Sequence, residues 1–358
     1  MRVVIIGAGV AGLALAHGLL NNGHEVEVYE RSPELRTKGG SITLWPGSTS
    51  ILREIGIDPG GVRLTTLDAW SPEGKKQFAV DLTAMERRFG APSIHVARRE
   101  LTERLAEGIP ITYNAKVVDV DVDKGEVRFE GGGSALGDVL VGADGRNSVV
   151  RQAVWGDDPA TLTGWITWQG FIDWPTEPIA RSIVGPQGMS GLSPAGPNKQ
   201  LVWFDLRSAP GKDLWQGDPD ALDKIRKLFG HYQGQTQDVL EAMTELEGFG
   251  HVVHKVPKVW GTGPITLVGD AAHSMPPTGA HGTNQALEDV WALSRSITGD
   301  LRAYERDRAR IANRSSSFAG SEMPNKPNPM AGIMTDRIAT KAYAWLIRRT
   351  SSYLLAAS

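Results

Sequence analysis

The sequence predicts an α/β fold in which a parallel-sheet, nucleotide-binding unit is interrupted by an α+β insertion. The chain of 358 residues begins with an apolar run, Val3–Ile6, as expected of a strand buried on both faces. Similar buried strands are expected at 139–141 and 265–268, on either side of a segment of alternating polar and apolar residues. A sheet that resumes after such a segment indicates a discontinuous first unit and a second, mostly antiparallel sheet.

A glycine-rich motif follows the first strand directly. Gly7, Ala8, Gly9, Val10, Ala11 and Gly12 form a G-x-G-x-x-G sequence, and apolar residues recur at helical spacing after it. The glycines of this motif allow a tight turn, close approach of a pyrophosphate, and close packing of helix on strand. Glu30 ends the next strand, where a carboxylate can accept hydrogen bonds from ribose hydroxyls. We therefore expect a bound dinucleotide.

Composition excludes several classes of function. Lys and Arg number 38 against 41 Asp and Glu, and a net charge of -3 gives no reason to expect binding to nucleic acid or to an anionic membrane. Zero cysteines exclude disulfides, thiolate metal sites and cysteine nucleophiles. With no ligand-spaced histidine cluster, no leader-like start and no long apolar run, we expect a cytoplasmic monomer or homodimer without a metal.

Two more motifs follow the later buried strands. Asp144-Gly145 comes after the first of them, and Gly269-Asp270 after the second. Open α/β sheets bind ligands beyond the carboxyl ends of their strands, so both aspartates are candidates. The second motif continues through Pro277 to a helix expected at about 283–297, whose start is Gly282, Thr283 and Asn284. Free N–H groups at such a start can bind an anion or a carbonyl.

Several other segments have two interpretations. Lys38-Gly39-Gly40 is either a flexible connection or a loop folded over a phosphate or flavin, and Arg98 is either a surface residue or faces that ligand. Trp165, Trp168, Trp203 and Trp215 belong to the inserted sheet, where they line a pocket or pack in the core. Strands are expected at 64–82, 164–174, 181–184 and 200–207, with a helix at 221–229. Helices are also expected at 300–313 and 336–355, with a loop at 315–332.

The three motifs, in this order and spacing, resemble those of the single-component (group A) FAD-dependent aromatic hydroxylases, the p-hydroxybenzoate hydroxylase-like flavoproteins. The likeness is greatest to the salicylate hydroxylases and bacterial FAD-dependent urate hydroxylases. It implies a Rossmann-like FAD-binding fold with a predominantly antiparallel β-sheet substrate region and C-terminal helices. The implied domains are an FAD-binding part (1–70, 95–155 and 255–310), a substrate-binding sheet region (71–94 and 156–254) and a C-terminal helical segment (311–358).

The resemblance also assigns residues by position. For FAD it implies the motif glycines, Glu30 and Arg31 at the adenosine ribose, Val118 at the adenine, Thr43 at the flavin, Arg98 near the ribityl phosphate, Asp144 and Gly145 for FAD and NAD(P)H, Asp270 at the ribitol, and Pro277, Gly282, Thr283 and Asn284 at the flavin ring. Substrate contacts are expected at Trp168, Gln169, Lys199 and Trp203. Relatives usually have Gln in place of His281 and often Arg in place of Gln169, and Lys199 loosely matches an arginine of urate-hydroxylating relatives.

The implied activity is that of an FAD-dependent monooxygenase. NAD(P)H would reduce FAD, O2 would form a C4a-hydroperoxyflavin, and one oxygen atom would enter a small aromatic or heteroaromatic substrate by hydroxylation or epoxidation. His281 is the candidate base, with a loop-capping role as the alternative. Other classes on the same fold are an FAD-dependent oxidoreductase or oxidase and a flavin-dependent halogenase. A halogenase should carry a W-x-W-x-I-P segment, which Gly164–Trp168 does not supply.

Overall fold

The computed structural model describes residues 1–37, 39–207, 218–322 and 334–357. Lys38, expected in a loop, and Trp215, expected either to line a pocket or to pack in the core, lie outside this part of the chain. None of the helices within it is both long and apolar enough to cross a membrane.

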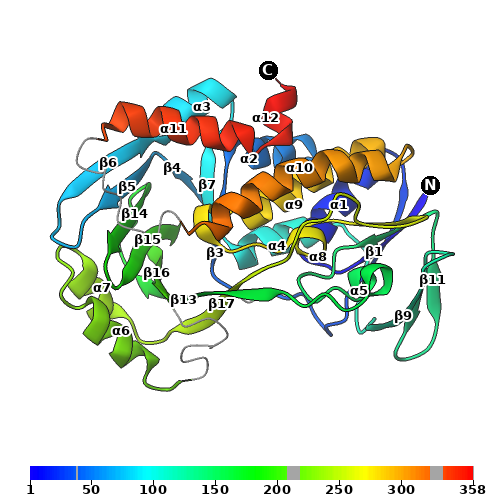
Figure 1. Cartoon of the computed structure of the whole chain (residues 1–358), viewed down its shortest axis with the longest axis horizontal. Helices are drawn as coiled ribbons and strands as arrows, with labels where there is room; N and C mark the ends of the chain where they lie inside the picture. Colours follow the sequence, from blue (N-terminus) through cyan, green and yellow to red (C-terminus); the bar gives the residue numbers. More distant parts are fainter. Residues whose placement is uncertain (38, 208–217, 323–333, 358) are drawn as a thin grey trace.

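A five-stranded parallel sheet forms the nucleotide-binding part. Its order is β18 (Ile265–Leu267), β12 (Val139–Gly142), β1 (Arg2–Ile6), β2 (Glu25–Tyr29) and β8 (Ile111–Thr112). All neighbouring pairs are parallel, so the carboxyl ends of β1, β12 and β18 meet at one edge. Figure 1 shows α1 (Val10–Asn21), α9 (His281–Ser296) and α10 (Leu301–Gly320) stacked beside this sheet. Both predicted strands are thus present: the one at 139–141 is β12, next to β1, and the one at 265–268 is β18, next to β12.

The inserted sheet has seven strands, in the order β17 (Glu247–Val253), β13 (Thr161–Asp173), β16 (Lys199–Arg207), β15 (Gly188–Gly196), β14 (Ile179–Gly185), β5 (Thr66–Trp70) and β6 (Lys76–Asp81). Every pair is antiparallel except β14 with β5. The helices α6 (Ala221–Phe229) and α7 (Thr236–Ala242) cover one face, at the lower left of Figure 1. The other face is directed toward the nucleotide-binding part.

Smaller elements connect these two parts. Two three-stranded sheets are formed by β3 (Ser41–Leu44), β7 (Ser93–Ala97) and β4 (Val62–Leu64), and by β9 (Val117–Asp121), β10 (Glu126–Phe129) and β11 (Ser134–Leu136). The remaining helices are α2 (Pro46–Glu54), α3 (Leu82–Phe89), α4 (Arg98–Ala106), α5 (Val149–Trp155), α8 (Asp270–His273), the 3-10 turn η1 (Thr278–Ala280), α11 (Asp336–Arg349) and α12 (Ser352–Ala356).

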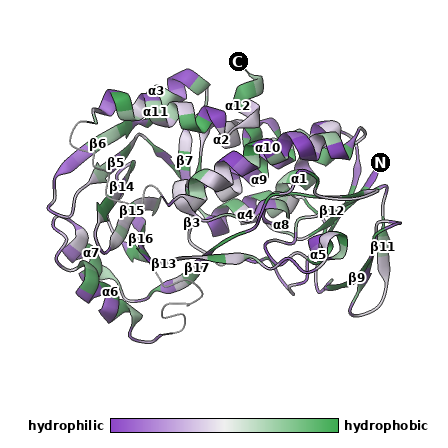
Figure 2. Ribbon diagram, viewed as in Figure 1, coloured by the Kyte–Doolittle hydropathy of each residue, from purple (hydrophilic) through white to green (hydrophobic). Residues whose placement is uncertain are grey.

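Buried apolar side chains form three clusters. The largest surrounds the parallel sheet, the second lies between the seven-stranded sheet and α6 and α7, and the third joins Trp45, Leu82 and Met85 to α11 and α12. Figure 2 shows hydrophobic and hydrophilic residues alternating around α10 and α11, as expected of helices with one buried side. The C-terminal helices therefore pack onto the rest of the chain.

Three sequence-based expectations are corrected here. No strand was expected at Gly188–Gly196, yet β15 is there, because its neighbours supply the ladder that its glycines do not favour. The helix expected at 283–297 begins at His281. The loop expected at 315–332 is helical as far as Gly320, since buried Ser315 and Ser316 lie on the packed side of α10. One expected domain boundary, residue 310, thus falls inside this helix.

Candidate cofactor and substrate site

The three motif glycines have different surroundings. Gly7 has φ of +109°, and a Cβ there would lie 2.5 Å from the carbonyl oxygen of Ala143. A Cβ at Gly12 would overlap the carbonyl oxygen of Gly7. At Gly9, by contrast, it would meet nothing within 4 Å. Gly7 and Gly12 are therefore required for packing, whereas Gly9 leaves open space before the first turn of α1, where a diphosphate is stabilised by free N–H groups.

Glu30 lies against this glycine loop. Its carboxylate is buried and accepts hydrogen bonds from the backbone N–H of Ala8 (3.0 Å) and of Ser32 (2.9 Å). Arg31 beside it is exposed, and Val118, on the edge strand β9, is 52% exposed. Glu30 and Arg31 thus follow the carboxyl end of β2, whereas Val118 belongs to the separate strand β9.

Asp144 sits where β12 ends. Its Oδ2 accepts a hydrogen bond from the N–H of Val149 (2.7 Å) at the start of α5, while its Oδ1 is buried without a partner in the described part of the chain. Burial raises the pKa of Asp144, although the hydrogen bonds that its carboxylate accepts act to lower it. An unused carboxylate oxygen beyond the end of a central strand is a ready acceptor for a hydroxyl of a bound ligand.

Arg151 joins the two aspartate motifs. Its guanidinium is buried and donates to the carbonyl oxygens of Arg146 (2.8 Å) and Ala271 (3.2 Å), which follow Asp144 and Asp270 respectively. The ring of His254 lies 2.9 Å from Nη2. One side chain thereby fixes the spacing of the two loops that carry Asp144 and Asp270.

The loop after β18 is held by a buried ion cluster. Gly269, at φ +59°, donates its N–H to Asp289 Oδ2 (2.8 Å), which also lies 2.6 Å from His273 Nε2. Arg308 of α10 donates to Asp289 Oδ1 (2.8 Å). Burial alone would raise the pKa of Asp289, but His273 and Arg308 hold it below its usual value. The cluster leaves Asp270 exposed at the edge of the sheet, and His273 holds the loop through its contact with Asp289.

Asn284 connects the start of α9 to strand β3. Its side chain accepts a hydrogen bond from the N–H of Trp45 (2.8 Å) and donates to the carbonyl oxygen of Thr43 (2.8 Å). The Thr43 hydroxyl lies 2.8 Å from Nδ1 of buried His95. A Cβ at Gly282 would meet nothing within 4 Å. The fold therefore brings Thr43 beside an open helix start formed by Gly282 and Thr283, and Pro277 begins the turn that leads there.

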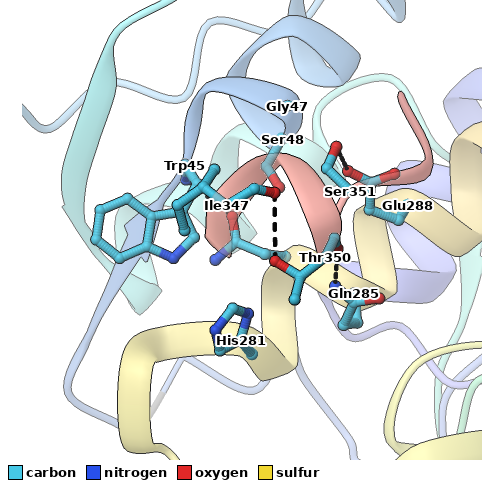
Figure 3. A pocket seen from close by; sticks show the side chains of 10 residues that line it. Trp45, Gly47, Ser48, His281, Gln285, Glu288, Ile347, Thr350 and Ser351 are labelled. Atoms are coloured by element: carbon cyan, nitrogen blue, oxygen red, sulfur yellow. Dashed lines mark hydrogen bonds between the residues drawn. The ribbon is translucent and has the colours of Figure 1, made fainter. Parts of the chain in front are cut away.

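His281 is buried beneath the C-terminal helices. It lies edge-on to Phe318 and lines a small cavity with Trp45 and Thr350 (Figure 3). Burial lowers its pKa to about 4, and its Nε2 has no partner among the described residues. In the same view Gln285 donates to the carbonyl oxygen of Thr350 and Ser351 donates to Glu288. His281 is thus a neutral, weakly basic imidazole on the C-terminal side of the loop.

One face of the seven-stranded sheet is directed toward these loops. We call this face the flavin-side face. Gln169 and Trp203 are register partners on it. The Gln169 amide approaches Gly40 so closely that a Cβ there would lie 2.5 Å from Oε1, and the carbonyl oxygen of Gly40 accepts the N–H of Arg98 (3.0 Å). Gln169, Arg98 and the loop before Thr43 therefore converge.

Of the other two predicted substrate residues, Lys199 lies on the flavin-side face at the start of β16, and Trp168 lies on the opposite face. Successive residues of a strand point to opposite faces, so Trp168 occupies the face opposite Gln169. It is 3% exposed and packs in the cluster under α6 and α7. Trp168 is therefore a core residue, and the expectation that it contacts the substrate is corrected. Lys199 is exposed at the first position of β16, with Nζ 5.3 Å from the ring of Phe171.

A buried polar network links the flavin-side face to the loop before α9. Thr167 donates to Asp205 Oδ1 (2.6 Å), and its oxygen lies 2.7 Å from His251 Nε2. The other ring nitrogen of His251 is 3.1 Å from Glu322, which accepts a hydrogen bond from Thr278. All five residues are at most 5% exposed. Sequence reasoning missed them because they belong to separate elements and match no motif.

Known proteins with similar sequences bind FAD, in agreement with the motifs described above. A sequence family described as "FAD binding domain" matches residues 1–319. This chain belongs to that family. Its sequence is 28% identical to 3-amino-4-hydroxybenzoate 2-monooxygenase of Streptomyces cremeus, over 82% of this chain and 77% of that protein. It is also 28% identical to an FAD-dependent urate hydroxylase of Klebsiella pneumoniae, over 86% of each.

Solved structures show the same fold. Klebsiella pneumoniae HpxO complexed with FAD and uric acid has a TM-score of 0.89 at 21% identity, covering 98% of this chain and 97% of that one. The tetrameric form of 2-methyl-3-hydroxypyridine-5-carboxylic acid oxygenase has a TM-score of 0.79 at 23% identity, covering 98% of both. The protein is an FAD-dependent monooxygenase of α/β fold.

The residues present fit FAD. Open space at Gly9 and Gly282, the unused Oδ1 of Asp144 and the exposed carboxylate of Asp270 lie at the sheet edge where the motifs converge. These are the features that a diphosphate, a ribitol chain and a flavin ring require: free N–H groups, hydroxyl acceptors and room for close approach.

Proposed function

We propose that this protein hydroxylates a small aromatic or heteroaromatic substrate, with NAD(P)H as reductant and O2 as the oxygen source. The observation that carries the proposal is the approach of Gln169, on the flavin-side face, to Gly40 beside Thr43 and Arg98. A substrate resting on this face would lie next to the cofactor site. Relatives named for hydroxybenzoate and urate act on electron-rich rings, which supports the same substrate class here.

When bound, FAD supplies the redox chemistry that activates O2. The tasks of the chain itself are to bind, orient and keep the site dry. Trp203 and Phe171 give the flavin-side face an apolar surface, and the Gln169 amide can donate to or accept from a ring oxygen or nitrogen. Asp144 and Asp270 would hold the hydroxyl groups of the cofactor.

The buried network supplies a route for a proton. Hydroxylation of a phenol or of an N–H ring is faster when the substrate loses a proton. His251 Nε2, Thr167 Oγ1 and Asp205 Oδ1 are within hydrogen-bond distance of one another on the flavin-side face. We assign His251 and Thr167 as positioning residues that pass a proton away from the site. The location of the protein in the cytoplasm and its oligomeric state stay predictions of the sequence.

The deciding experiment uses isotopic oxygen. Holoenzyme is incubated with NADH or NADPH, ¹⁸O2 and a panel of hydroxybenzoates, hydroxypyridines and urate. We expect at least one ring compound to stimulate NAD(P)H oxidation and to gain one ¹⁸O atom. A dehydrogenated product without ¹⁸O, formed together with ¹⁸O-labelled peroxide in the absence of NAD(P)H, would indicate an oxidase. A halogenated product in the presence of chloride would indicate a halogenase.

The network has its own test. His251→Gln keeps a hydrogen-bonding side chain but removes the imidazole, so we expect a lower kcat and a larger share of NAD(P)H lost as hydrogen peroxide, with KM changed little. His231→Gln is the matched control because His231 is exposed. If both variants formed the same amount of product per NAD(P)H oxidised, the network would have no role in the reaction.

A further inference from the structure

A separate cavity lies on the back face of the seven-stranded sheet, away from the cofactor site. Its volume is about 300 Å³, and it is bounded by β5, β14, β15 and β16 and by the turn before α7 (Figure 1, left). Leu192, Val202 and Phe204 line it, and the same residues belong to the core cluster under α6 and α7. The sheet therefore stands between this cavity and the flavin-side face that carries Gln169 and Trp203.

The walls suit a small aromatic molecule. Trp70, Ile183 and Phe204 provide flat or branched apolar surface, and the volume is at the lower end of the range for ligand pockets. The space exists because small residues stand where larger ones would fill it. Ser190 lies in β15 on the cavity side, and Gly74 and Gly234 lie in the turns after β5 and before α7.

Two hydrogen-bond donors at the cavity are unused. Within the described residues, the buried Nε1 of Trp70 and the buried Nε of Arg181 have no hydrogen-bond partner, although both side chains line the cavity. Each of these atoms carries an N–H and can only donate. A ligand oxygen that accepts hydrogen bonds would satisfy them, and a buried donor without a partner is unfavourable.

The charges around the cavity are balanced. Arg181 forms an ion pair with Glu177, and its other terminal nitrogen donates to Gln235. Asp68, the register partner of Arg181, forms an ion pair with Lys76 (3.1 Å). Since each cation already has its anion, a carboxylate would gain little here, and an uncharged acceptor such as a carbonyl is favoured.

We propose that this cavity is a second binding site, specific for a small uncharged aromatic molecule with a hydrogen-bond-accepting oxygen, such as an aryl ketone. The proposal goes beyond the hydroxylation reaction and does not depend on it. Occupancy of the site changes no covalent bond. Its apolar walls select the ring, and the N–H groups of Trp70 and Arg181 select the oxygen.

Equilibrium dialysis of the holoenzyme tests the selectivity. Acetophenone, ethylbenzene and benzoate serve as probes of the same ring size. We expect acetophenone to bind at least tenfold more tightly than ethylbenzene, which lacks the acceptor, and more tightly than charged benzoate. Equal affinity for acetophenone and ethylbenzene, or no binding of acetophenone, would overturn the proposal.

Variants locate the binding. Trp70→Phe keeps the apolar ring but removes the donor, so acetophenone affinity should fall about tenfold, the equivalent of one hydrogen bond. Trp345→Phe is the control, since Trp345 is 58% exposed on α11 and does not line the cavity. Ser190→Leu fills the space and should abolish binding while FAD absorbance reports an intact fold.

A crystal soaked with 4-bromoacetophenone gives a direct position. An anomalous bromine peak between β15 and α7 is the expected result. Binding that persists unchanged in Trp70→Phe and Ser190→Leu, with bromine only beside the flavin, would show that the probe occupies the substrate site instead.

Discussion

At the scale of single residues, the glycines of the first motif divide between packing and ligand binding. Gly7 and Gly12 are enclosed by protein atoms, but Gly9 borders open space. The same sequence motif therefore contains residues whose replacement harms folding and one whose replacement harms cofactor binding.

Gly9→Ala separates these effects. The added methyl group touches no protein atom, so the variant should fold normally, but it occupies room that the diphosphate needs. We expect FAD affinity of the apoprotein to fall at least tenfold, measured by quenching of flavin fluorescence. Gly131→Ala is the control, because a Cβ there also meets nothing and lies far from the motif in sequence. An unchanged FAD affinity would contradict the assignment of Gly9.

His281 gives a prediction about pH. Its pKa is about 4 in the folded chain against 6.5 for an unperturbed histidine, so below pH 6.5 the unfolded state binds a proton that the folded state does not. The free energy of unfolding should fall by about 1.4 kcal/mol per pH unit from this residue as pH drops from 6.5 toward 4. His95, with the same lowered pKa, adds a similar dependence.

His281→Gln removes one of these two contributions. Urea unfolding between pH 7 and 4.5 should show a shallower loss of stability than the unaltered protein, with the dependence due to His95 still present. Exposed His231→Gln should leave the slope as it is. Parallel curves for His281→Gln and the unaltered protein would show that folding does not lower the pKa of His281.

At the scale of elements, α9 and α10 hold the second aspartate motif through side chains rather than through backbone contacts. Arg308 is 1% exposed and donates to Asp289, to Gln285 (2.8 Å) and to Ser352 (2.6 Å). Three helices and the loop at Gly269 thereby share one guanidinium.

Arg308→Met should consequently be severe. The apolar stem would still fill the space, but the carboxylate of Asp289 would lose a buried partner charge, which costs about 3–5 kcal/mol. The loss is measured as the free energy of unfolding in urea. Arg310→Met on the same helix is the control, since Arg310 is exposed and should change stability by less than about 0.5 kcal/mol. Similar values for both variants would contradict the role of Arg308.

At the scale of the whole molecule, the C-terminal helices complete the nucleotide-binding part. Ser351 and the N–H of Tyr353 donate to buried Glu288, whose pKa burial raises. Leu354 packs in the cluster that contains Trp45, next to the β3 strand that Asn284 holds. The end of the chain is therefore connected to the flavin loop through two layers of side chains.

Truncation after Arg349 tests this connection. Removal of the last nine residues takes away the partners of Glu288 and the apolar contact of Leu354, and several kcal/mol of lost stability should lower Tm by about 5–10 °C. Retained FAD after gel filtration should fall as well. Truncation after Ala356 keeps α12 and serves as the control. An unaltered Tm and full flavin retention in the protein truncated after Arg349 would disprove the connection.

Much of the architecture was predictable because local patterns carried it. The apolar run at Val3–Ile6, the motif glycines and the strand before Asp144 each match a recurrent unit, and helix α6 begins and ends where its pattern does. Strand β15 was missed because glycine and proline disfavour strands, and only Trp203, lying over Gly191, gives a reason for glycine there.

By itself, the sequence determined the parallel sheet, the three cofactor motifs and the family to which they belong, since each depends on residues close together along the chain. The tertiary structure alone decided which side chains meet across the chain: the burial of His281, the turn of Trp168 to the back face, and the network from Thr278 to Asp205. The physical reason is that hydrogen bonds and burial depend on distance in space, and residues separated by up to 155 positions, as Thr167 and Glu322 are, leave no pattern by which that distance can be read.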